Sequence, residues 1–162
     1  MKKIIFLIPV FNDWDSLKRL MEEINQNISN IEDFLFECIV INDASTILKP
    51  ELKRPKNIKS LQILNMSKNK GHARCNAFGI RYINENKKFD YVILMDGDGE
   101  DRPEEIKTLI NSIKNDPVNS VVAKRVKRSE GPIFQFLYLS HKILTFFFTG
   151  KKINFGNYSC LT

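Results

Sequence analysis

Apolar runs of strand length alternate with helical patterns along the chain. The strand-length runs are Ile4–Val10, which is apolar at every position, and Phe36–Ile41, Leu61–Leu64, Tyr91–Met95 and Val118–Ala123. The helical patterns between them run from Asp15 to Ile28, from Gly71 to about Asn84, and from Pro103 to about Lys114. Continuous apolar strands are typical of parallel strands that are covered on both faces. The order therefore predicts βαβ units and an α/β fold, with a mostly parallel sheet flanked by helices.

The first helical pattern has the clearest period. Its apolar residues recur every three or four positions: Leu17, Leu20, Met21, Ile24 and Ile28. Asp13 or Asp15 can accept hydrogen bonds as its N-cap. Thr46 to Lys59 has two prolines, several lysines and no clear period, so it is expected to be a loop.

A more apolar helix is expected from Ile133 to Phe148. Its polar or amphipathic residues fall on one narrow stripe, and its about 16 residues are fewer than the roughly 20 that span a membrane. Two interpretations remain open. The helix packs against the sheet or a partner subunit in a homo-oligomer, or it lies in a membrane interface, helped by the basic residues of Lys124–Arg128 and by Lys151 and Lys152.

Composition is ordinary for one folded domain, with 162 residues, 43% hydrophobic and 27% charged. The net charge of +6 suits an anionic partner. The basic residues form no continuous aromatic-lined stripe, so nucleic acid is not expected as that partner. Three widely spaced cysteines favour free thiols in a reducing compartment. The apolar run at the N-terminus is too short for a signal peptide, which favours a first strand in a cytoplasmic protein.

Acidic residues follow three of the expected strands. Asp13 comes after the first, Asp43 after the second, and Asp96 with Asp98 after the fourth. Each alone is more often a cap or a turn residue. In open α/β sheets, however, ligands bind beyond the carboxyl ends of the strands, so acidic residues at one edge predict a ligand site there.

The loop from Asp96 to Asp101 carries four carboxylates in six residues. Like charges this close repel unless a cation lies among them. Asp96, Asp98 and Glu100 alternate and could converge on one ion, and oxygen ligands suit Mg²⁺ or Mn²⁺. A calcium EF-hand is excluded, since Asp101 and Lys107 stand where Gly and Glu are required. Ordinary surface acidity remains the alternative.

Asn69, Lys70 and Gly71 open the helical pattern that runs to about Asn84. A helix N-terminus beside a glycine can bind an anion, and Lys70 and Arg74 could add positive charge. Many helices begin this way, so the signal is weak by itself. His72 is more often a surface histidine than a catalyst.

Together these pieces resemble the family 2 glycosyltransferases of GT-A fold. The branch that they resemble is the one similar to dolichol-phosphate mannose synthase and bacterial polyprenyl-phosphate sugar transferases. The matching segments are Ile8–Asp13, Val40–Ser45, Asn69 and Gly71 followed by Gly79, and Leu94–Glu104. They occur in the family's order over about residues 4 to 125. Two departures are Asn42, where the family often has Asp, and the unusual spacing of small residues around Arg74.

The resemblance implies roles for the matching positions. Pro9, Asp13, Asp43 and Gly71 would bind the nucleotide sugar, with Asp43 on the base or ribose. Asp96 and Asp98 would be the catalytic D-x-D pair that holds the metal and the diphosphate. Glu100, where this branch commonly has Gln, would be a further metal ligand. Arg125 would face a donor or acceptor phosphate.

The implied reaction moves a sugar from a nucleotide-diphosphate sugar to an acceptor, with Mg²⁺ or Mn²⁺ as cofactor. A phosphate acceptor is ionised near neutral pH and needs no strong general base, which favours a polyprenyl phosphate over a saccharide hydroxyl. This predicts a membrane-associated enzyme of the cell envelope, acting at the inner face of the membrane. A non-catalytic membrane-surface module is the non-enzymatic alternative.

The expected organisation has two parts in one domain. Residues 1–130 would form the nucleotide-sugar-binding core, and residues 131–162 the apolar helix and the start of an acceptor-side segment. Members of the resembled family continue beyond such a segment, so we expect the C-terminal part of the domain to be truncated here.

Overall fold

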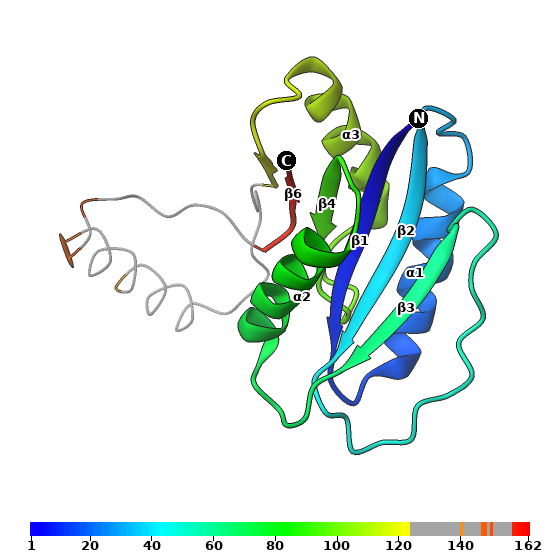
Figure 1. Ribbon diagram of the computed structural model, residues 1–162, viewed down its shortest axis with the longest axis vertical. Coiled ribbons are helices and arrows are strands. Elements are labelled where there is room, and N and C mark those ends of the chain that lie inside the picture. Colours follow the sequence, from blue (N-terminus) through cyan, green and yellow to red (C-terminus); the bar gives the residue numbers. More distant parts are fainter. Residues whose placement is uncertain (124–139, 141–146, 149, 151–156) are drawn as a thin grey trace.

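The computed structural model describes residues 1–123, 140, 147–148, 150 and 157–162. Its described elements form one six-stranded sheet with helices on both faces (Figure 1). The strands are β1 (Lys2–Val10), β2 (Phe34–Asn42), β3 (Ser60–Asn65), β4 (Tyr91–Leu94), β5 (Val121–Val122) and β6 (Ser159–Leu161). The helices are α1 (Trp14–Ile28), α2 (His72–Asn86), the 3₁₀ turn η1 (Pro103–Glu105) and α3 (Ile106–Asn115).

The sheet has the strand order β3-β2-β1-β4-β6-β5. The pairs β1–β2, β1–β4 and β2–β3 are parallel, whereas β6 runs antiparallel to both β4 and β5. The expected α/β fold with a mostly parallel sheet is therefore confirmed. Parallel pairing places the carboxyl ends of β1, β2 and β4 at one edge of the sheet, the lower edge in Figure 1.

Alternate residues of β1 face the two layers of helices, because successive side chains of a strand point to opposite faces. Ile4, Phe6 and Ile8 are fully buried in the cluster that includes α1 and α3. Ile5 and Leu7 are fully buried in the cluster that includes α2. Figure 1 shows α2 on one face of the sheet and α1 with α3 on the other. Burial on both faces explains why β1 is apolar at every position.

The far edge of the sheet differs from expectation. The predicted strand Val118–Ala123 shrinks to the two residues of β5, and Val118 is 79% exposed. The three-residue β6 was not anticipated, and it lies between β4 and β5. Such a short strand has no periodicity of its own, since it exists only through its pairing with β4 and β5.

Several predictions lie outside the described residues. These are Arg125, the basic residues of Lys124–Arg128 and most of the helix expected over Ile133–Phe148. Among the helices that are described, none is both long enough and apolar enough to cross a membrane.

Candidate active site

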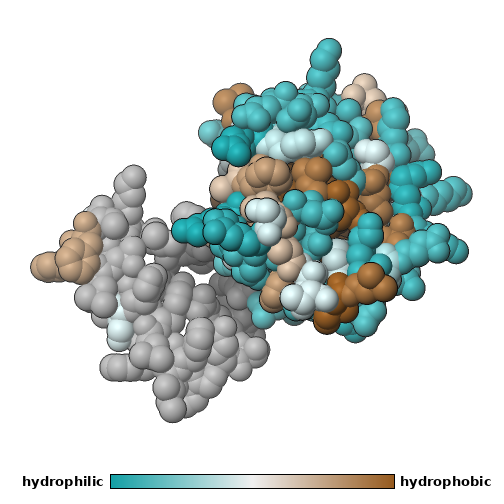
Figure 2. All heavy atoms as spheres, turned by 60° about the horizontal axis from the view of Figure 1, so that its bottom comes forward, coloured by the Kyte–Doolittle hydropathy of each residue, from teal (hydrophilic) through white to brown (hydrophobic). Residues whose placement is uncertain are grey.

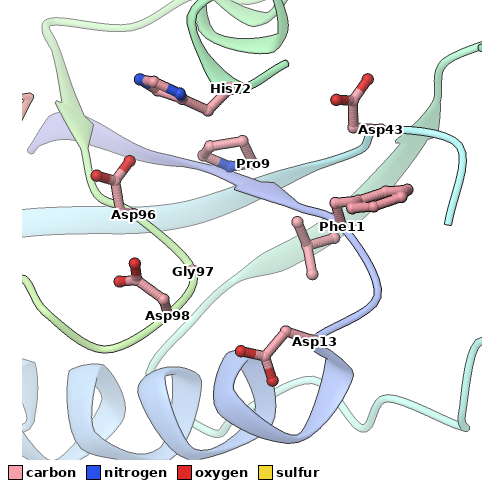
Figure 3. Close-up of a pocket in the computed structure, with 9 residues that line it drawn as sticks. Pro9, Phe11, Asp13, Asp43, His72, Asp96, Gly97 and Asp98 are labelled. Carbon is pink, nitrogen blue, oxygen red and sulfur yellow. The ribbon is translucent and has the colours of Figure 1, made fainter. Parts of the chain in front are cut away.

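A pocket of about 410 Å³ opens at the carboxyl ends of the parallel strands. This face of the molecule, brought forward in Figure 2, exposes apolar side chains among hydrophilic ones. Figure 3 shows the residues that line the pocket, which come from the ends of β1, β2 and β4 and from the start of α2. They are Pro9, Val10, Phe11, Asp13, Asp43, His72, Asp96, Gly97 and Asp98. The predicted edge of the sheet therefore does carry a concave site.

The two acidic residues that follow β4 flank Gly97. A Cβ atom on Gly97 would lie 2.7 Å from the carbonyl oxygen of Pro9, closer than real contacts allow. Glycine is therefore required where this loop passes over the end of β1. The close approach places Asp96 and Asp98 beside Pro9 at one side of the pocket, away from Asp43 (Figure 3).

Asp96 is held by two contacts. Its backbone N–H donates to Oδ2 of Asp101 at 2.9 Å, and its own Oδ1 accepts from Nδ2 of Asn157 at 2.8 Å. Asp98 is exposed, and its Oδ1 accepts from the backbone N–H of Glu100 at 2.9 Å. The acidic loop thus fixes Asp96 firmly and leaves Asp98 facing solvent.

The residues present fit a divalent cation that takes only part of its ligands from the protein. Asp96 and Asp98 both line the pocket, whereas Glu100 is exposed and does not. Within the described part of the chain, no three residues among His, Cys, Asp and Glu are grouped closely enough to hold a metal. Two carboxylates still suit Mg²⁺, which usually keeps waters and substrate phosphates as its other ligands. The expected set of three carboxylates is not assembled here.

Asp43 is bound to the loop that leads into α2. Its Oδ1 accepts from the backbone N–H of Lys70 at 2.7 Å and its Oδ2 from that of Gly71 at 2.8 Å. The residue is only 3% exposed. Both carboxylate oxygens therefore hold the α2 loop against the end of β2, a role that the family resemblance does not imply.

The cysteine beside Asp43 is an inert thiol. Burial is the main cause that raises the pKa of Cys75 to about 12, and the hydrogen bond and the negative charge of Asp43 add to it. The nucleophilic form of cysteine is the thiolate, so this group has no reactive role at neutral pH.

Gly71 and His72 start α2 at the pocket. Gly71 has a φ of +82° and is the N-cap residue, a conformation that glycine adopts without strain. His72 lines the pocket and, in Figure 3, its imidazole lies toward the side of Asp96. His72 is exposed, as expected of a surface histidine, and it also lines the pocket. Gly71 shapes the wall without lining it, and the exposed Arg74 does not line it either.

The end of β1 forms the remaining wall. Oδ1 of Asp13 accepts from the backbone N–H of Ser16 at 3.2 Å, which makes Asp13 the N-cap of α1 as well as a pocket residue. Phe11 is 47% exposed and also lines the pocket. Sequence reasoning had not singled it out, although a large apolar residue just beyond a strand end, before Asn12, is a usable signal.

Asn12 fixes this rim to the loop after β2. It has a φ of +57°, and its Oδ1 accepts from the backbone N–H groups of Thr46 and Ile47 at 2.7 and 3.1 Å. Oγ of Ser45 accepts from the backbone N–H of Asn12 at 2.9 Å. The ends of β1 and β2 are therefore joined by side-chain hydrogen bonds, which preorganises the pocket rim.

Comparison with solved structures finds the same fold. TarS of S. aureus in complex with UDP-GlcNAc superposes with a TM-score of 0.57 at 18% identity, over 81% of this chain and 36% of TarS. The mannosyltransferase PcManGT from Pyrobaculum calidifontis, in complex with GDP-Man and Mn²⁺, gives a TM-score of 0.52 at 19% identity, over 75% of this chain and 35% of that one. At such identities the likeness concerns the fold.

Comparison at the sequence level gives a relative and a family. The uncharacterized protein MJ0544 of Methanocaldococcus jannaschii is 22% identical over 127 residues, which are 75% of this chain and 52% of the relative. The chain thus spans about half the length of that relative. The family model described as glycosyl transferase family 2 matches residues 5–161. With nearly its whole length matched, and with the α/β sheet and pocket described above, the chain belongs to glycosyl transferase family 2.

Proposed function

We propose that the pocket binds a nucleotide-diphosphate sugar together with a divalent cation, and that the protein transfers the sugar to an acceptor. The observation that carries this proposal is the joint placement of Asp96 and Asp98 at one side of a 410 Å³ pocket. The pocket lies at the carboxyl ends of the strands, where open α/β sheets bind ligands. UDP-GlcNAc in TarS, and GDP-Man with Mn²⁺ in PcManGT, support the donor class.

The lining divides into two parts with different chemistry. Asp96 and Asp98 would hold the cation and, through it, the diphosphate, and the bound cation would neutralise charge on the leaving diphosphate. Phe11 and Asp43 lie away from these two carboxylates in Figure 3, which suits the nucleoside. The exposed face of Phe11 can stack on a base, and the backbone that Asp43 holds would shape this end.

In this proposal His72 would contact the phosphates. It is the first residue of α2, where the unsatisfied N–H groups and the helix dipole favour an anion. Its imidazole lies toward the side of Asp96 in Figure 3. A diphosphate between His72 and the cation would be bound from both sides, in a preorganised arrangement that lowers the barrier to its departure.

We further propose a polyprenyl phosphate as the acceptor, at the inner face of the membrane. The second phosphate pKa is about 6, so this nucleophile is largely ionised at neutral pH and needs no strong general base. The basic residues of Lys124–Arg128 and the apolar segment Ile133–Phe148 support a lipid phosphate. A saccharide hydroxyl acceptor and a non-catalytic membrane module are the competing outcomes of the experiments below.

The donor proposal is tested by thermal unfolding with UDP-, GDP- and CMP-sugars, with and without Mn²⁺. A ligand at 100 times its Kd stabilises the folded state by about 2.7 kcal/mol, or roughly 5–11 °C for a chain of this size. We expect one nucleotide to give such a shift only with Mn²⁺, and Asp98→Ala to abolish it. Asp33→Ala is the matched control, because Asp33 is exposed and precedes β2 at the opposite edge of the sheet. A flat response across the panel would contradict the donor proposal.

The acceptor proposal is tested by transfer assays with the preferred donor. Short-chain polyprenyl phosphate in detergent is compared with soluble saccharides. Transfer to a saccharide hydroxyl, with polyprenyl phosphate ignored, would overturn the acceptor proposal and leave the donor site standing. Vesicle binding without any metal-dependent nucleotide binding would support the membrane module instead.

A further inference from the structure

A residue far from the acidic loop in sequence contacts its first carboxylate. Asn157 lies 61 positions after Asp96, and its Nδ2 donates to Oδ1 of Asp96 at 2.8 Å. We propose that Asn157 is a positioning residue for the cation, because its amide fixes one oxygen of Asp96 and directs the other to the metal. This inference rests on the proposed function, since it concerns the same cation.

The segment that carries Asn157 is itself anchored. In β6, Ser159 and Cys160 pair with Leu94 and Ile93 of β4. The Ser159 hydroxyl donates to the backbone carbonyl of Asn157 at 3.0 Å. Asn157 therefore lies at a fixed position beside the carboxyl end of β4, where the acidic loop begins.

The next residue attaches this segment to the far end of the same loop. The hydroxyl of Tyr158 donates to the backbone carbonyl of Arg102 at 3.2 Å, and Tyr158 is 4% exposed. Asn157 and Tyr158 thus contact the acidic loop near its two ends. The geometry of Asp96 depends on β6 through these contacts, as well as on β4.

The hydrogen bond from Asn157 gives the two carboxylate oxygens of Asp96 different surroundings. Oδ1 accepts from Asn157, and among the described residues Oδ2 accepts no hydrogen bond. The backbone N–H of Asp96 donates to Asp101, so main chain and side chain are each held. A neutral amide fixes the carboxylate without cancelling its charge, whereas a lysine or an arginine would compete with the cation. Partners of metal ligands orient those ligands in this way, and their loss typically costs 10–100-fold in metal affinity.

The experiment measures Mn²⁺ affinity by titration calorimetry and by Mn²⁺ electron paramagnetic resonance, with and without the nucleoside diphosphate that the parent prefers. Asn157→Ala is expected to weaken Mn²⁺ binding by about 10–100-fold. Asn119→Ala is the matched control, because Nδ2 of Asn119 donates to Oδ2 of Asp116 at 2.9 Å in an exposed turn outside the pocket. The control is expected to bind Mn²⁺ within twofold of the parent.

A second variant separates positioning from a merely structural bond. Asn157→Asp keeps the size of the side chain but replaces the amide donor by a carboxylate next to Asp96. Without metal the two like charges repel, so the folded state should be less stable than that of the parent. With Mn²⁺ the added carboxylate should recover that stability, so the Tm of Asn157→Asp should rise more with Mn²⁺ than that of the parent.

The outcomes separate the two proposals. Asn157→Ala must first show the circular dichroism of the parent. If it then binds Mn²⁺ with an affinity within twofold of that of the parent, the positioning role is overturned and the donor-site proposal still stands. The same Mn²⁺-dependent Tm rise in Asn157→Asp and the parent would also count against it. A parent that binds neither Mn²⁺ nor a nucleotide would overturn the proposed function and this inference with it.

Discussion

Asp43 offers the sharpest test of how the pocket wall is held. We consider Asp43→Asn, which removes the charge and replaces one acceptor oxygen by an NH₂ group. Asp43 accepts from the backbone N–H groups of Lys70 and Gly71. In Asp43→Asn only one of these two N–H groups would keep an acceptor. The other would face a donor inside a buried site.

The magnitude follows from these two bonds. A hydrogen bond to a charged group contributes about 1.5–3 kcal/mol, and a buried polar group left unsatisfied costs about 1–3 kcal/mol. These terms overlap, so we expect Asp43→Asn to lower the free energy of unfolding by about 2–4 kcal/mol. For a chain of 162 residues, about 3 kcal/mol corresponds to a Tm decrease of roughly 6–12 °C.

Asp90→Asn is the matched control. Asp90 also accepts from a backbone N–H, that of Lys3, at 2.7 Å, but the bond is exposed. Water can replace the lost acceptor there, so this variant should lose less than about 1 kcal/mol. The two variants make the same chemical change in a buried and in an exposed setting.

The assay is guanidinium unfolding followed by circular dichroism and by the fluorescence of Trp14. Trp14 is the single tryptophan, is 4% exposed and donates from Nε1 to the carbonyl of Ile47, so it reports on the pocket rim. Asp43→Asn should also lower the pKa of Cys75 below about 12, because the contribution of the Asp43 charge disappears. Unfolding free energies of Asp43→Asn and Asp90→Asn within about 1 kcal/mol of each other would refute the structural role of Asp43.

Three further predictions concern the glycines and the thiols. Gly97→Ala should lose about 1–3 kcal/mol of stability and weaken nucleotide binding in a titration, because the added Cβ forces the acidic loop off β1. Gly99→Ala is the control: Gly99 has a φ of +83°, but a Cβ there would meet no atom within 4 Å, so this variant should lose stability yet keep more nucleotide affinity. Equal losses of nucleotide affinity in the two variants would contradict this reasoning. Gly79→Ala should lower the Tm, since its Cβ would lie 2.4 Å from Cδ1 of Leu7, and an unchanged Tm would show that Leu7 moves aside freely. The three cysteines are buried with their pKa raised to about 12 from 9.0, so a thiol reagent at pH 8 should label them only after unfolding. Because the unfolded chain releases these protons at lower pH than the folded protein, stability should fall as the pH rises above about 9, and labelling of the native protein at pH 8 would contradict the burial.

Local pattern sufficed for the parts of the fold that are buried on both faces. β1 was recognised because its residues Ile4–Val10 are all buried, and such a strand is apolar throughout. α1 was recognised because one face packs on the sheet and its apolar residues repeat accordingly. In both elements, burial in the fold produces a hydrophobic pattern that can be read from neighbouring residues in the sequence.

The edge strands β5 and β6 show no such hydrophobic pattern. β5 is two residues long and β6 three, and both exist because their backbone groups pair with strands distant in sequence. The pairing of Leu94 with Ser159 joins segments 65 positions apart, which periodicity cannot detect. The sequence pattern therefore overestimated β5 and missed β6.

The candidate site divides in the same way. The amino-acid sequence by itself determined the acidic residues at the strand ends, because a parallel sheet brings those ends to one edge whatever the details of packing. Only the tertiary structure decided what each one does. Asp43 accepts hydrogen bonds from the loop that leads into α2, and Asp96 accepts one from Asn157. Glu100 does not line the pocket. Hydrogen-bond partners depend on atomic positions set by segments far apart in the chain, and that information is absent from any local pattern.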